Sequence, residues 1–322
     1  MTDVSDQAVV GAVQTDAAGG VEQPIGTGAT TERARSLWSD AWDELRHKPL
    51  FWISTALILL FVLMAAVPQL FTSADPHFAD LSKARDAPSA DAWFGRDGQG
   101  YDVYARTIYG ARASILVGLF ATLFTLVLGA VVGIITGYRG GWLDSVLSRV
   151  SEIFLAIPLL LGGILFLYTF PSELGTPFLV IVGKVALVLG ILGWPTIARL
   201  MRSSVLQVKP NDYVQAARAL GAGSGRIIMS HILPNSVASV IVVSTINLGA
   251  YIAVEATLSF LGIGLQPPAI SWGIAISEAS GIGLIRAAPH MLLFPSLFLS
   301  LTVLAFIMLG DAIRDALDPK LR

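Results

Sequence analysis

Few side chains in this sequence are of the types that carry out covalent chemistry. The chain has no cysteine, which excludes disulfide bonds, thiolate metal sites and thiol catalysis. Its histidines are far apart, and none has a second ligand at a spacing typical of a metal site; they are His47, His77, His231 and His290. No candidate nucleophile is paired with a base. We therefore expect neither a metal site nor an enzyme active site in this chain.

A nucleotide-binding loop is also missing from the sequence. Such a loop has the form G-x-x-x-x-G-K-[ST], because its glycine-rich backbone cradles phosphate groups. The pair Gly183-Lys184 is followed by Val185 and lies within an apolar block. We therefore expect this chain to bind no ATP and no other cofactor.

Two ionisable side chains, Lys184 and Glu255, lie within apolar blocks. A charge at the centre of a membrane helix costs about 2.5–3.5 kcal/mol on insertion scales, so both residues are candidates for a translocation path or for pairing between helices. Lys184 is near the start of its block, where its ammonium can extend outward to the interface. Glu255 lies deeper in its block. For both residues we favour a structural role over contact with a substrate.

The elements that would position these residues are long apolar blocks. Apolar residues make up 54% of the 322-residue chain and charged residues only 14%, whereas soluble domains average about a quarter charged. A membrane span needs about 20 residues at a rise of about 1.5 Å each. Six blocks are long enough: residues 51–71, 114–138, 153–170, 177–197, 237–261 and 291–309. The sequence therefore predicts an all-α membrane protein with six transmembrane helices.

Small residues within these blocks indicate close helix packing. Gly129, Gly133 and Gly137 recur at a spacing that places them on one face of a helix. They predict a tight contact with another helix, which the sequence does not identify.

The distribution of Lys and Arg predicts the orientation of the spans. With the N-terminus placed in the cytoplasm, fourteen of the 21 Lys and Arg residues fall on the cytoplasmic side, six fall outside and Lys184 lies within a span. Basic residues are enriched in cytoplasmic loops, so we expect both termini in the cytoplasm. The net charge of −2 argues against a nucleic-acid partner.

The polar region before the first span divides into two parts. Residues 1–31 have no apolar period, so we expect a disordered cytoplasmic tail and no signal peptide. Residues 32–50 carry Trp38, Trp42 and Leu45 at helical spacing, which indicates an amphipathic helix at the membrane surface. A simple linker to the first span is an equally good interpretation of this second part.

Residues 198–236, between the fourth and fifth blocks, are too polar to span and too regularly patterned to be a simple tether. Asn211 or Asp212 can cap a helix over 213–220, and Gly221 can take the left-handed conformation that ends it. Ser224 can cap a second helix over 225–233, which Pro234 would end.

The apolar side chains of this segment are too few to form a core alone; they are Tyr213, Val214, Ala217 and Leu220. We expect them to be buried against another protein. A helical hairpin that packs on its own spans is the competing interpretation.

This loop resembles the E-A-A loop of ATP-binding-cassette (ABC) importer permeases. Q-A-A-R-A-L-G is followed after nine residues by H-I-L-P, which matches the family spacing of E-A-A, three residues, Gly, nine residues, an apolar residue, one further residue and Leu-Pro. Gln215 replaces the usual Glu, and His231 occupies the apolar position. Neither difference changes the spacing.

Further segments narrow the resemblance to the dipeptide, oligopeptide and nickel permeases. Residues 95–114 are similar to G-T-D-x-x-G-R-D-V-x-S-R followed by Y-G-A-R-x-S, with Tyr101 and Ala105 in place of Arg and Ser. Residues 255–273 and 309–320 also match closely. The resemblance covers residues 35–322 and implies the C-type subunit, with a type I ABC importer (MetI-like) fold.

The domain organisation expected on this basis has six parts. They are a tail (1–31), an interfacial helix (32–50), a first transmembrane helix (51–71), an external segment (72–113), a MetI-like transmembrane domain (114–310) that includes the coupling loop (198–236), and a cytoplasmic C-terminal tail (311–322).

The resemblance also implies a location, partners and a site. The chain would lie in the bacterial cytoplasmic (inner) membrane beside a homologous B-type permease subunit. Two separate ATP-binding subunits would hold ATP and Mg, and an extracytoplasmic peptide-binding protein would deliver the substrate. The ATPase would dock on the coupling loop, at Tyr213, Gln215, Ala216, Ala217, Leu220, Gly221 and Pro234.

Alternative functions remain open at this point. Nickel permeases share these motifs, so nickel or another small solute is an alternative substrate, although no His or Cys cluster in the spans favours a metal. An ion-coupled secondary transporter would have internal repeats and paired acids at mid-membrane, neither of which is clear in this sequence. We therefore favour import of dipeptides or oligopeptides.

Overall fold

The computed structural model describes residues 37–173 and 175–317. The expected tail (1–31), the start of the expected interfacial helix and the last residues of the C-terminal tail lie outside these ranges. The α-helices are α1 (Leu37–Leu45), α2 (Pro49–Ala66), α3 (Val103–Arg139), α4 (Gly141–Ala156), α5 (Leu159–Thr169), α6 (Phe178–Val208), α7 (Asp212–Ala219), α8 (Ser224–Ile227), α9 (Leu233–Phe260), α10 (Trp272–Ala279), α11 (Ile282–Ala287) and α12 (His290–Leu317). Within the described ranges there is no strand beyond two isolated bridges.

Five segments are helices long and apolar enough to cross a membrane, namely α2, α3, α6, the run from α8 to α9, and α12. The sixth candidate is a pair, because α4 and α5 meet at an angle of 82°. The block expected to span at 153–170 is therefore divided between the last residues of α4 and α5. Pro158 precedes the first residue of α5 and has no N–H to continue the hydrogen bonds of α4.

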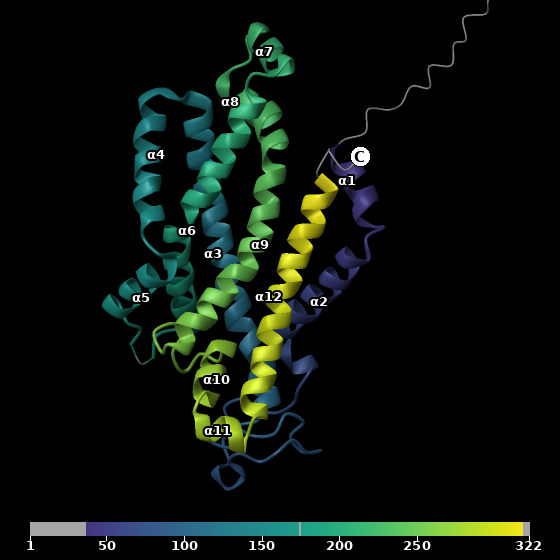
Figure 1. Cartoon of the computed structure of the whole chain (residues 1–322), viewed down its shortest axis with the longest axis vertical. Coiled ribbons are helices and arrows are strands. Elements are labelled where there is room, and N and C mark those ends of the chain that lie inside the picture. Colours follow the sequence, from purple (N-terminus) through teal and green to yellow (C-terminus); the bar gives the residue numbers. More distant parts are fainter. Residues whose placement is uncertain (1–36, 174, 318–322) are drawn as a thin grey trace, which may run out of the picture. The chain divides into compact units, whose positions relative to one another are not determined.

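The two ends of the helix bundle differ. Figure 1 shows α7 and α8 at one end, and α10 and α11 at the opposite end; we call these the α7 end and the α10 end. Several helices extend beyond the apolar blocks. α3 begins at Val103, within the segment expected to lie outside the spans, and α6 continues to Val208, within the expected coupling loop.

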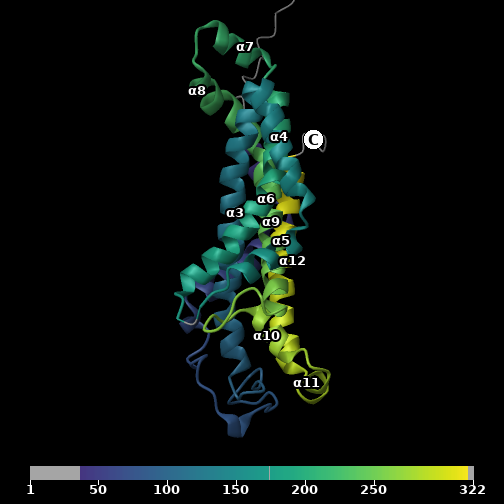
Figure 2. The ribbon, with the colours of Figure 1, turned by 90° about the vertical axis from the view of Figure 1, so that its left-hand side faces the viewer.

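Gly129, Gly133 and Gly137 lie on one face of α3, which we call the glycine stripe, and this face packs against α6. A Cβ on Gly129 would lie 2.7 Å from the Cβ of Ile197, and one on Gly137 would lie 2.8 Å from the Cβ of Val205. α3 and α6 run side by side in both views (Figures 1 and 2). The helix that the sequence did not identify is therefore α6. Small residues permit this approach, and it stabilises the pair by van der Waals contact, since lipid is as apolar as the helix surfaces.

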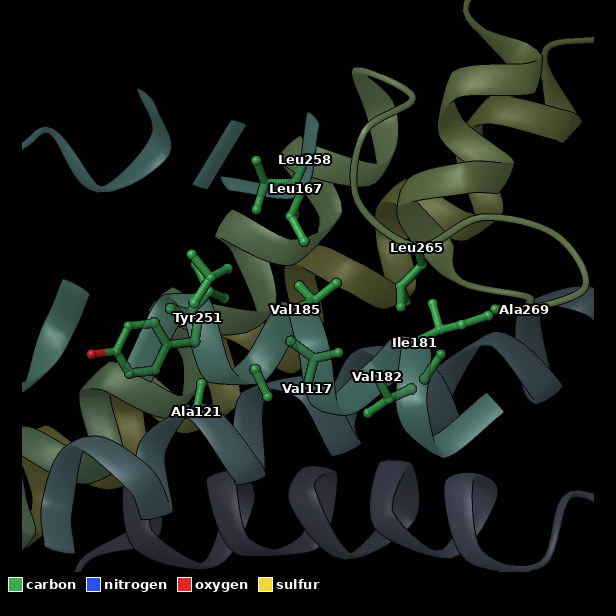
Figure 3. Close-up of a cluster of buried hydrophobic side chains, with 14 of the residues drawn as sticks. Val117, Ala121, Leu167, Ile181, Val182, Val185, Tyr251, Leu258, Leu265 and Ala269 are labelled. Carbon is green, nitrogen blue, oxygen red and sulfur yellow. The ribbon is translucent and has the colours of Figure 1, made fainter. Parts of the chain in front are cut away.

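A cluster of buried aliphatic side chains joins α3, α5, α6 and α9 (Figure 3). Val117 of α3, Val185 of α6 and Leu258 of α9 are all buried there, and Leu167 brings α5 to the same cluster. Leu265 extends it into the segment between α9 and α10. This cluster fixes the relative positions of the helices that carry the ionisable residues.

The segment between α2 and α3 is fastened to the α10 end by polar contacts. Asp102 caps α3, its Oδ1 accepting from the Ala105 N–H at 2.9 Å. Arg106 Nη1 donates to Asp97 Oδ2 at 2.7 Å and to Glu278 Oε2 at 3.0 Å, which links this segment and α10 to α3. The buried Trp272 of α10 donates to the Thr107 carbonyl at 2.8 Å.

The N-terminal helix packs on the C-terminal one. Ala41 and Leu45 of α1 are buried against Ala312 and Ala316 of α12. The first residues of the expected C-terminal tail therefore belong to a helix that continues to Leu317.

Candidate functional site

The candidate site is α7 with the turns on either side of it. α7 lies beyond the long helices in both views (Figures 1 and 2). It covers nearly all of the helix expected over 213–220. Asn211 stands at its N-cap position without a capping hydrogen bond, because its Nδ2 donates to the Tyr213 hydroxyl at 3.3 Å. The expected side-chain cap is therefore absent.

Gly221 ends α7 in the left-handed conformation, with φ of 84°. The Gly221 N–H donates to the Arg218 carbonyl and the Ala222 N–H to the Ala217 carbonyl, both at 3.0 Å. This pair of bonds is a Schellman motif, which satisfies carbonyls that the helix end leaves free. Glycine suits the position because residues with a Cβ are strained at this φ. The result is a sharp turn that sets the direction of the chain after α7.

One apolar side chain anchors α7 to its own spans. Val214 is fully buried with Met201 and Val205 of α6, Ile227 of α8 and Val240 of α9. The expectation that every apolar residue of this segment is buried against another protein is therefore wrong for Val214. Successive helical residues point in directions about 100° apart, so Val214 faces inward while Tyr213 does not.

A neighbouring face of α7, about 100° around the helix from Val214, is uncovered. Tyr213, Ala216, Ala217 and Leu220 stand at positions i, i+3, i+4 and i+7, which share one face of a helix; we call them the α7 face. Tyr213 is 43% exposed and Leu220 is 88% exposed, with Ala216 exposed and Ala217 half-buried. An exposed leucine flanked by small residues gives another protein an apolar side chain and room for close approach.

Gln215 fixes the turn between α6 and α7. Its Nε2 donates to the Lys209 carbonyl at 3.1 Å, and Lys209 Nζ donates to the Tyr138 carbonyl at 2.7 Å. An ionised glutamate accepts but does not donate hydrogen bonds, so it could not make the first of these bonds. Glutamine in place of the usual glutamate of E-A-A therefore makes a hydrogen bond that holds the turn before α7.

The second helix of the loop does not end at Pro234, contrary to the expectation from sequence. After α8, the π-helical turn Ile228–Ile232 leads directly into α9, and Pro234 stands in the first turn of α9. Proline is tolerated in a first turn because its missing N–H has no partner there. Ser224 does not cap α8 with its side chain. The run from α8 to α9 therefore joins the α7 segment to a membrane-spanning helix without a flexible break.

Lys184 lies at the junction between α5 and α6. Its Nζ donates to the carbonyls of Phe170 and Pro171 at 3.2 and 3.0 Å, and to Ser172 Oγ at 3.2 Å. These acceptors belong to the segment that follows α5. The lysine thus holds the end of α5 against α6.

Glu255 is fully buried in α9. Its Oε1 accepts from Ser259 Oγ at 2.7 Å, and Ser259 Oγ in turn accepts from the Leu265 N–H at 2.9 Å. The structure does not bring Lys184 and Glu255 into an ion pair; within the described ranges neither has a partner of opposite charge. Glu255 is therefore linked through Ser259 to the segment between α9 and α10.

An ion pair between α4 and α6 was missed by the sequence analysis. Arg202 Nε and Nη2 donate to the two oxygens of Asp144, each at 2.7 Å. The two residues are 58 positions apart, so neither periodicity nor local spacing indicates this pair. This two-point contact holds the α7 end of α4 against α6.

Replacing Asp144 by asparagine is expected to destabilise the fold by about 1–2 kcal/mol, because the half-buried Arg202 would lose a charged two-point acceptor. The Glu152→Gln variant is the matched control. Its pair with Arg149 is exposed, at 51% and 81%, and should contribute at most about 0.5 kcal/mol. Unfolding in mixed micelles, followed by tryptophan fluorescence, would measure both. Equal stability losses in the two variants would contradict the role given to Asp144.

Residues 129–322 match the family described as "Binding-protein-dependent transport system inner membrane component". The match includes α6, the α7 face and the spans on either side of it. The chain belongs to this family of permeases. Residues 36–88 of the permease also match the "N-terminal TM domain of oligopeptide transport permease C", which agrees with the C-type resemblance.

Similar permeases are known from several bacteria. The chain is 38% identical to the oligopeptide transport system permease protein OppC of Bacillus subtilis, over 91% of this chain and 92% of OppC. It is 40% identical to the dipeptide transport system permease protein DppC of the same organism, over 89% and 87%. It is 36% identical to the glutathione transport system permease protein GsiD of Pectobacterium atrosepticum, over 89% and 93%. The permease is thus an all-α membrane protein of the ABC importer class.

Proposed function

We propose that this permease is one of two membrane subunits of an ABC importer that carries dipeptides or oligopeptides into a bacterium. The uncovered α7 face is the observation that supports this most directly. It presents Tyr213 and Leu220 to the exterior while Val214 fastens the same helix to α6 and α9. The similarity to permeases for dipeptides, oligopeptides and glutathione supports a peptide as the substrate.

The proposed partners follow from the resemblance to ABC importer permeases, and the missing nucleotide-binding loop supports a separate ATPase. Two ATP-binding subunits hold ATP and Mg and supply the ATPase activity, so this chain is not itself an enzyme. A homologous B-type permease completes the membrane portion as a heterodimer. An extracytoplasmic binding protein delivers the peptide. Residues 72–113 and 311–322 remain proposed domains, external and cytoplasmic respectively.

The α7 end is placed in the cytoplasm in this proposal, with both termini on the same side of the inner membrane. The larger number of Lys and Arg residues on that side supports this orientation. The ATPases then meet α7, and the binding protein meets the α10 end.

Coupling in this proposal is mechanical. When the ATPases close on ATP, they displace α7, and Val214 passes the displacement to the buried cluster that joins α8 and the π-helical turn to α6 and α9. Tyr213 is the aromatic anchor, the alanines allow close approach, and Gly221 sets the angle of the turn. Gln215 keeps α7 fixed to the end of α6, and Pro234 begins the span that moves.

In this proposal Lys184 and Glu255 hold neighbouring parts of the chain together and do not bind the substrate. Lys184 holds the end of α5, and Glu255 holds the segment between α9 and α10. Among the described residues there is no group of three or more His, Cys, Asp or Glu side chains that could hold a metal ion.

The test is uptake into proteoliposomes that contain both permeases and the ATPases, with the binding protein added. Labelled dipeptide, pentapeptide, glutathione and Ni²⁺ would be compared with and without ATP. We expect ATP-dependent accumulation of peptide and none of Ni²⁺. Uptake of Ni²⁺ alone, or peptide uptake driven by an ion gradient without ATP, would contradict the proposal.

A further inference from the structure

A cavity with three polar side chains in a mostly apolar lining opens at the break between α4 and α5. It has a volume of about 310 Å³ and lies between the break, α6 and α9. Ile157 and Pro158 line it from the break, Thr196 from α6, and Asn247 and Tyr251 from α9. Asn247 is near the middle of α9, so the cavity lies well inside the span.

The break itself favours a cavity that contains water or substrate. The 82° bend interrupts the helical hydrogen bonds within an apolar segment. Irregular backbone at membrane depth is tolerated where it is buried in protein or lines a cavity, because lipid offers no hydrogen bonds. Here Ile157 and Pro158 line the cavity.

Three side chains supply neutral hydrogen-bonding groups to this cavity. Asn247 is half-buried, and among the described residues its amide has no hydrogen-bond partner. By contrast, Thr245 and Thr257 of the same helix satisfy their hydroxyls on carbonyls one turn earlier, those of Ile241 and Ala253. An unpartnered amide within a span is costly, and such residues mark transport paths. Asn247 is therefore the central polar group of the cavity.

Thr196 adds a hydroxyl from α6, and Tyr251 adds a hydroxyl that also hydrogen-bonds with Thr125 of α3. Tyr251 is only 4% exposed, and its hydroxyl points away from the aliphatic cluster (Figure 3). Gly193 makes room for it, because a Cβ at this position would collide with the Tyr251 oxygen. Thr196 is exposed and also lines the cavity.

The lining contains no Asp, Glu, Lys, Arg or His. A metal cation would need carboxylate, imidazole or thiolate ligands, and a charged side chain would need an opposite charge. An asparagine amide offers one acceptor and two donors, which complement the N–H and C=O of a peptide group. We propose that Asn247, with Thr196 and Tyr251, binds main-chain amides of the transported peptide as it passes this subunit.

This inference rests on the proposed function and deepens it. Recognition of the main chain by neutral groups would let the same cavity pass peptides whose side chains differ. It also predicts that transport depends on the amide groups of the peptide main chain.

The test uses the complete transporter in proteoliposomes, with binding protein saturated by either a tripeptide or the same tripeptide carrying N-methyl groups on its amides. We expect Asn247→Ala to lower transport of the unmodified tripeptide about five- to tenfold, the effect of losing about one hydrogen bond. The N-methylated tripeptide should be transported slowly by the original complex and no more slowly by the variant. Asn247→Gln should restore part of the rate.

Thr245→Val is the matched control on the same helix and should transport like the original complex. Thr196→Val provides an independent variant with an expected loss of about two- to fivefold. Equal rates for the original, Asn247→Ala and Thr196→Val complexes would overturn the inference while leaving peptide import intact. Loss of the second permease from purified Asn247→Ala complex would overturn it in favour of a subunit contact. Absence of peptide transport by the original complex would overturn the proposed function and this inference together.

Discussion

Replacing Leu220 by glutamate should separate this permease from its ATPase while leaving the helix bundle folded. Leu220 is 88% exposed, so the substitution changes little in the isolated chain. In the complex, however, the new carboxylate would be buried against an apolar surface of the ATPase, with no partner of opposite charge. Such a change at the centre of an interface costs about 2–4 kcal/mol, which corresponds to a loss of affinity of about 30-fold or more. Co-purification of the ATPase with the tagged permease measures this effect.

Leu81→Glu is the matched control for this variant. Leu81 is 75% exposed and lies in the segment between α2 and α3, at the opposite end from α7. The same substitution there should leave the ATPase bound. If Leu220→Glu retains the ATPase as fully as Leu81→Glu, then α7 is not the docking element.

Adding a single methyl group at Gly133 should destabilise the packing of α3 on α6. A Cβ at Gly133 would lie 2.5 Å from the Ala198 carbonyl oxygen and 2.6 Å from the Cβ of Met201. Both atoms belong to the rigid part of α6, so the two helices would have to separate. We expect Gly133→Ala to lower the free energy of unfolding by about 1–3 kcal/mol, the usual cost of overpacking. Unfolding in mixed micelles gives this quantity.

Gly183 provides the control, because it lies in α6 and a Cβ there meets nothing within 4 Å. Alanine has a higher helix propensity than glycine by about 1 kcal/mol. Gly183→Ala should therefore be neutral or slightly stabilising. A similar stability for the two variants would show that the glycine stripe is not a close-packed contact.

The parts of the fold that sequence predicts well are those governed by local patterns. Apolar length located the spans, since the bilayer imposes a minimum length on every helix that crosses it. The spacing of Gly129, Gly133 and Gly137 predicted a close helix contact, because small residues on one face permit close approach. The three glycines do pack against α6. Gly221 was predicted to be left-handed, and it has φ of 84°.

The remaining features depend on contacts between distant residues. Pro234 was interpreted as a stop because proline disrupts a helix interior, but the π-helical turn before it makes this position a helix start. Val214 faces inward because α6, α8 and α9 converge beneath α7, which no local pattern reveals. The ion pair between Asp144 and Arg202 joins residues 58 positions apart.

The bend between α4 and α5 also affects what can hold this part of the chain in the bilayer. α4 has 16 residues and α5 has 11, so they are about 24 and 16 Å long, both shorter than the hydrocarbon core of about 30 Å. Neither half can be held across the bilayer by its own length. Leu167 of α5 is buried against residues of α6 such as Val185, and Lys184 holds the end of α5. Contacts with α6 therefore supply the support for α5 that its own length does not give.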